Sequence, residues 1–81
     1  MEILTNLMEV LDEIENNIKE LNFITRQDKE YIEVKCYNKK TKDLLYDRYD
    51  TILDTLKYHQ GMLRLIKMKE RNFIWKNIGI F

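Results

Sequence analysis

The stretch Tyr31-Ile32-Glu33-Val34-Lys35-Cys36-Tyr37 decides the fold class of this chain. Apolar side chains at its even positions alternate with charged side chains between them, so the two kinds fall on opposite faces of an extended segment. On a helix the same apolar residues would scatter around the axis. The alternation therefore predicts a half-buried strand over residues 31–37.

Residues on both sides of this strand predict partners for it. Residues 38–43, Asn-Lys-Lys-Thr-Lys-Asp, have the polar character of a hairpin loop. A return strand then covers residues 44–49, and a strand at 23–26 pairs in front, turning at residues 27–29. The middle block, residues 22–50, is thus predicted to be a three-stranded antiparallel meander.

A helix is predicted before this block, over residues 2–21. Its apolar residues follow a three-four spacing that places them on one stripe, with glutamates on the opposite face. The stripe consists of Leu4, Leu7, Leu11, Ile14, Ile18 and Leu21. Such spacing suits coiled-coil pairing and equally suits packing on a sheet or helix.

A second helix is predicted after the block, over residues 51–72. Thr51 followed by Asp54 resembles a capping box with Asp in the acidic position. Its buried stripe is formed by Ile52, Leu56, Leu63 and Ile66. The fold class is therefore α+β, in the order helix, three-stranded antiparallel meander, helix, within one small domain.

An all-α helical hairpin is the alternative. A three-four spacing also runs without a break from the middle block into the last helix, so one long helix starting near Thr41 accounts for it too. The residues concerned are Leu45, Tyr49, Ile52, Leu56, His59, Leu63 and Ile66.

The segment 34–45 resembles the hairpin of the flagellar FlaG family, whose pattern is V-x-V-x-D-x-x-T-G-E-V-I. Lys42 stands where that pattern has glycine, and the R-Q-I-P that follows in the family is absent. No function is carried over from this resemblance. The helix–meander–helix order also resembles, in topology alone, some small phage inhibitors of bacterial immunity.

Composition bounds the class of protein. Eighty-one residues make one domain with a modest core. Absent alanine and proline with abundant lysine, asparagine and isoleucine are typical of an AT-rich genome such as that of a phage. No signal peptide or membrane-length apolar run is visible, so a cytoplasmic location is expected. The single Cys36 precludes an intrachain disulfide.

Catalytic motifs are absent from the sequence. There is no serine, no phosphate loop and no metal-ligand spacing, so no enzyme activity, cofactor or metal is predicted. Cys36 on the inward strand face is interpreted as a buried thiol rather than a nucleophile. His59 on the helix stripe is interpreted as a packing histidine, with a pH-sensing contact as the alternative.

Charge is balanced overall but unevenly distributed. Residues 1–33 carry nine acids and three bases, and residues 57–81 carry six bases and one acid. A basic flank of Lys57, Arg64, Lys67 and Arg71, continued by Trp75, can track phosphates or meet an acidic protein surface. Pairing of this flank with the acidic first helix is the alternative.

Apolar residues outside the main stripe predict a contact surface. Tyr58 and Leu65 lie on a face that a simple amphipathic helix keeps polar, and the tail, residues 73–81, is densely apolar from Phe73 through Trp75 to its end. The domain itself, a twin subunit, a target or a membrane surface has to cover them.

These features favour a protein–protein interaction module that forms a homo-oligomer or acts as a phage-type or mobile-element-type inhibitor of a host protein. Its expected partner-binding residues are Tyr58, Leu65, Arg64, Lys67, Arg71, Phe73 and Trp75. The alternative is a small nucleic-acid-binding protein using the basic last helix, although net neutrality argues against it.

Overall fold

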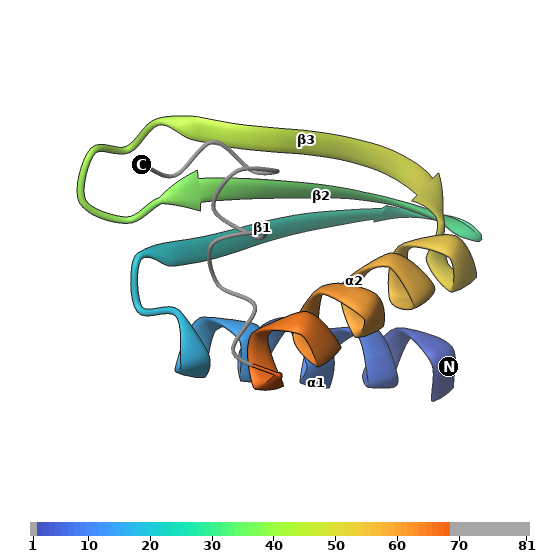
Figure 1. The fold of residues 1–81 in the computed structure, drawn as a ribbon. Helices are drawn as coiled ribbons and strands as arrows, with labels where there is room; N and C mark the ends of the chain where they lie inside the picture. Colours follow the sequence, from blue (N-terminus) through green and yellow to red (C-terminus); the bar gives the residue numbers. More distant parts are fainter. Residues whose placement is uncertain (1, 69–81) are drawn as a thin grey trace.

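A computed structural model describes residues 2–68 and confirms the α+β prediction. The element order is α1 (Glu2–Asn17), β1 (Leu21–Asp28), β2 (Tyr31–Asn38), β3 (Leu44–Thr51) and α2 (Ile52–Lys67). The three strands form one antiparallel sheet in the order β1-β2-β3 (Figure 1). The all-α hairpin is therefore wrong, since residues 44–51 pair with β2 instead of extending α2.

Both helices lie on the same side of the sheet, so residues 2–68 form two layers, and neither α1 nor α2 covers the other sheet face (Figure 1). The alternation in β2 decides which face is covered. Ile32, Val34 and Cys36 are fully buried beneath the helices. A sheet covered on one side needs one apolar face only, which is the pattern that β2 carries.

The core forms along the α1 stripe predicted from sequence. Leu7 and Leu11 pack with Ile32 and Val34, while Ile14 and Ile18 pack with Cys36 and the end of α2. Val10 and Phe23 contact both groups of residues and join them into one core. Burial of this kind contributes roughly 25 cal/mol per Å² of apolar surface.

The bounds of the two helices agree with the sequence prediction at the start of α2 and differ from it at the end of α1. Thr51 caps α2 as expected, because its hydroxyl accepts a 3.1 Å hydrogen bond from the Asp54 amide. The first helix, however, ends at Asn17 rather than at Leu21. Leu21 is buried as predicted, but as the first residue of β1 opposite Asn38. The proposed continuation of the last helix to residue 72 lies outside the described residues.

Both edge strands carry protection against pairing with further strands. On β1, the Phe23 amide donates a 2.7 Å hydrogen bond to the Glu15 carboxylate of α1. On β3, a bulge interrupts the register opposite Cys36 and Tyr37. Arg48 and Asp50 of β3 lie opposite the buried Val34 and Ile32, which places two charges on the helix-covered side. Bulges and inward charges at an edge both disfavour strand addition.

Candidate functional site

The sheet face away from α1 and α2, called the outer face below, carries several exposed apolar side chains. Four of its side chains are large, apolar and widely exposed: Ile24 (53%), Leu44 (51%), Tyr49 (52%) and Tyr31 (40%). Half-buried Tyr37 lies directly opposite Leu44. Charged residues stand between them, and Arg26 pairs with Glu33 across β1 and β2. Large apolar side chains mixed with arginine are typical of protein interfaces.

One end of the outer face holds a fixed aromatic pair. The rings of Tyr31 and Tyr49 stack nearly parallel, with centroids 5.6 Å apart and an angle of 7°. The Tyr49 hydroxyl donates a 2.9 Å hydrogen bond to Asp28, and this acceptor raises the pKa of Tyr49. The pair is therefore held in place before any partner arrives, which lowers the entropy lost on binding.

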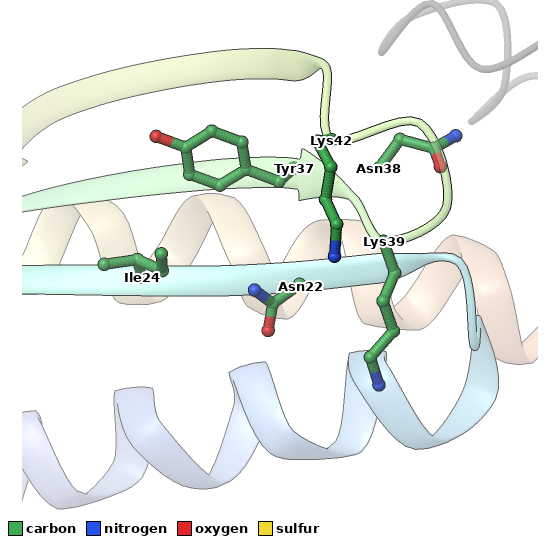
Figure 2. Close-up of a pocket in the computed structure, with 6 residues that line it drawn as sticks. All are labelled: Asn22, Ile24, Tyr37, Asn38, Lys39 and Lys42. Carbon is green, nitrogen blue, oxygen red and sulfur yellow. The ribbon is translucent and has the colours of Figure 1, made fainter.

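The other end of the outer face is a shallow hollow of about 220 Å³. It lies beside the β2–β3 hairpin loop, and its lining combines apolar, amide and ammonium groups (Figure 2). The lining residues are Asn22, Ile24, Tyr37, Asn38, Lys39 and Lys42.

A second cluster lies between β3 and α2 on the covered side. The buried His59 ring donates from Nδ1 to the Thr55 carbonyl at 2.8 Å, which leaves Nε2 to accept from the Tyr46 hydroxyl at 2.8 Å. The pKa of His59 is lowered to about 4, mainly by burial; the hydrogen bond to the Thr55 carbonyl opposes this shift, and the nearby charge of Arg48 adds to it. This is the neutral tautomer of a packing histidine.

Cys36 borders this cluster without the character of a nucleophile. It is fully buried, and this burial, which a hydrogen bond with Tyr46 offsets only in part, leaves the pKa of its thiol raised to about 12. A thiol that stays protonated at neutral pH attacks poorly. The Nε2 atom of His59 is already engaged by Tyr46 and is not free to act as its base.

We expect the folded protein to resist thiol-modifying reagents until it unfolds. The reason is that Cys36 has neither solvent access nor thiolate character. Ellman's reagent should react with the native protein only at its unfolding rate and with the urea-unfolded protein at once. Cys36→Val should retain any native activity. Rapid native labelling, or loss of function in a folded Cys36→Val protein, would contradict the buried-thiol interpretation.

The predicted partner-binding residues are distributed over α2. Tyr58 is exposed at 36%, but its ring contacts His59 edge to face at 4.9 Å and lies 3.9 Å below the Arg48 guanidinium. Leu65 is half-buried and packs on the core around Ile14, so it serves the fold as well. Both thus have intramolecular contacts that helical spacing does not reveal.

The basic flank is partly occupied as well. Lys67 forms an ion pair with Glu13 of α1, which matches the alternative of pairing between the acidic and basic helices. Lys57 and Arg64 are exposed and form no ion pair within residues 2–68. Arg71, Phe73 and Trp75 lie outside the described residues, as does the rest of the tail.

The outer-face residues were missed in the partner-binding prediction. The alternation in β2 already placed Tyr31 and Tyr37 on the face opposite Ile32, but it did not show that both helices cover the Ile32 side. Neither helix within residues 2–68 is long and apolar enough to cross a membrane. No three potential metal ligands gather in that range either.

No protein-family model, no curated protein and no solved structure matches this chain. The function has to be argued from the surfaces themselves.

Proposed function

We propose that this domain is a non-enzymatic module that binds another protein through the outer face of its sheet. The observation that supports the proposal is the exposure of Ile24, Leu44 and Tyr49 on the sheet face that neither α1 nor α2 covers. Each is about half exposed, and together with the Tyr31–Tyr49 stack they give a preformed apolar surface. An inhibitor of a host protein is the most concrete form of such a module.

The protected edges favour a face-to-face mode of binding. Strand addition at β1 meets the Glu15 carboxylate, and strand addition at β3 meets the bulge and the inward charges. A partner that packs on the outer face needs neither edge. Ring faces and aliphatic side chains then supply the anchors, with Arg26, Glu33 and Lys35 between them for specificity.

Replacement of Tyr49 by serine should weaken partner binding while the variant stays folded. Removing an aromatic anchor from an interface typically costs about 2 kcal/mol, or about 30-fold in affinity. The tagged wild-type domain, Tyr49→Ser and Lys57→Gln should be compared in pull-downs from the native host, with circular dichroism to check folding. The same partner should be captured by wild type and Lys57→Gln, and lost with Tyr49→Ser.

Light scattering over a concentration series separates a homodimer from a hetero-complex. If the wild-type protein is a dimer and the Tyr49→Ser variant is a monomer, the partner is a second copy of this chain. Equal capture of the same partner by wild type and Tyr49→Ser would exclude the outer face as the binding surface.

Nucleic-acid binding by α2 is the second candidate, because exposed Lys57 and Arg64 lie seven residues apart on this helix and form no ion pair within the described residues. Ionic contacts of this kind weaken steeply with salt. A filter-binding assay measures whether the protein binds nucleic acid and how this binding depends on salt. Salt-dependent binding that Lys57→Gln loses and Tyr49→Ser retains would favour this function over the first.

A further inference from the structure

We propose that the hollow around Lys42 receives the carboxylate of an acidic side chain on the protein partner, next to an apolar residue that packs on Ile24 and Tyr37. This inference rests on the proposed function and specifies the chemistry of its partner. It assigns one end of the outer face to charge recognition and the other, with the Tyr31–Tyr49 stack, to apolar contact.

The geometry of the hollow fits a carboxylate beside an apolar group. In Figure 2 the Lys42 side chain extends from the loop toward β1, and its ammonium group ends beside β1, on the side of the hollow that Asn22 and Lys39 also line. Ile24 and Tyr37 give the hollow an apolar side. An ammonium and a side-chain amide can both donate hydrogen bonds to one carboxylate.

The backbone conformation at Lys42 allows its side chain to be tested by substitution with glycine. Lys42 has φ 69°, in the left-handed region that disfavours residues with a Cβ. The loop holds it there through hydrogen bonds from the Lys42 amide to the Asn38 carbonyl at 2.8 Å and from the Asn38 amide to the Asp43 carbonyl at 2.9 Å. Glycine would fit this position without strain. Glycine is therefore a substitution that removes the Lys42 side chain without disturbing the loop.

The charge of Lys42 is not satisfied within the described chain. Lys42 and Lys39, the two lysines that line the hollow, form no ion pair with any residue of 2–68. By contrast, the other end of the outer face carries the paired Arg26 and Glu33 and the hydrogen-bonded Asp28. An acidic partner group is therefore complementary to the hairpin end alone.

A protein carboxylate fits this face better than a nucleic-acid phosphate chain. A bound strand needs a track of several cations along its backbone. On the outer face Asp47 lies opposite Lys35, and Glu33 and Asp28 lie farther from the hairpin, so a bound strand would meet three carboxylates along the face. The exposed Ile24 and Leu44 provide aliphatic contact, which a protein segment can match.

An NMR titration with two short peptides tests this inference. The probe is an acetylated, amidated pentapeptide of alternating glutamate and leucine, and its counterpart has glutamine in place of glutamate. The glutamate peptide should shift the amide signals of Asn22, Tyr37 and Lys42, and the glutamine peptide should bind about tenfold more weakly.

Two glycine variants form a matched pair for this titration. Lys29 in the β1–β2 turn also has a positive φ, 58°, but does not line the hollow. Lys42→Gly and Lys29→Gly therefore relieve the same kind of strain, and neither should lower the urea midpoint of unfolding. Only Lys42→Gly should lose binding of the glutamate peptide, by about tenfold.

The remaining outcomes overturn the inference. Equal binding of both peptides, no shift with either, or full binding by Lys42→Gly would each exclude a carboxylate site. Tighter binding of an oligothymidylate at the same amides would assign the hollow to nucleic acid instead. Failure of the proposed function is distinguishable, because the Tyr49→Ser pull-down involves the other end of the face and leaves Lys42 intact.

Discussion

Lowering the pH from 6.5 to about 4 should remove about 3 kcal/mol from the free energy of unfolding through His59 alone. The imidazole has an ordinary pKa of 6.5 in the unfolded chain and about 4 in the fold. Between these values the unfolded state binds the extra proton, so stability falls as the pH falls. The contribution of His59 is fully present above pH 6.5 and is lost by about pH 4.

The surroundings of His59 explain why the proton is excluded. Nδ1 already donates to the Thr55 carbonyl, and Nε2 accepts from the Tyr46 hydroxyl, so a second ring proton would displace that donor. The rings of Phe23 and Tyr58 also contact the imidazole edge to face and keep water away. Arg48, from β3, adds a like charge.

Urea unfolding at a series of pH values measures this loss. The chain has one histidine, so the part of the slope between pH 6.5 and 4.5 that is absent in a His59 variant reports on this imidazole. His59→Gln should flatten that slope. An NMR titration of the wild-type imidazole gives the same answer without a variant, and an imidazole pKa near 6.5 in the native protein would contradict the expected loss.

Ile32→Ala should destabilise the domain by about 2–5 kcal/mol, whereas Ile24→Ala should change its stability by less than about 1 kcal/mol. Ile32 is fully buried at the centre of the sheet, packed with Leu7, Leu11 and Leu56. Truncating it removes apolar contacts and leaves a cavity. Ile24 is half exposed on the outer face, where water replaces the lost methyl groups.

Both variants make the same chemical change in neighbouring strands, so they form their own control. Urea denaturation at neutral pH gives the two free energies. Similar losses in both would mean that the outer face is covered in the folded monomer. The proposed binding surface would then have to be reconsidered.

Local sequence determined several features of this protein. The alternation in residues 31–37 predicted β2 and its inward residues, and the Thr51 hydroxyl gave the start of α2. Both follow from short-range physics, because side-chain direction in a strand and the free amides of a helix start depend only on nearby residues.

Other features depended on partners distant in sequence. Leu21 continues the three-four spacing from Ile18 and also the alternation with Phe23, so its own neighbourhood permits either structure. Its pairing with Asn38, and the hydrogen bond from the Lys39 amide to the Glu20 carbonyl at 2.6 Å, place it in the sheet. In the same way, Tyr49 fits a helical stripe until β3 pairs with β2.

The candidate site was the least predictable part. The bulge between β2 and β3 determines which residues of 44–51 face the helices. As a result, Tyr46 and Arg48 lie toward α2, whereas Leu44 and Tyr49 are exposed. The sequence specified two faces for each strand and an apolar stripe for each helix. The alternation in β2 predicted which of its faces is inward. Which residues of β1 and β3 share the outer face with Tyr31 was decided only by strand pairing and packing, because register and burial depend on the whole assembly.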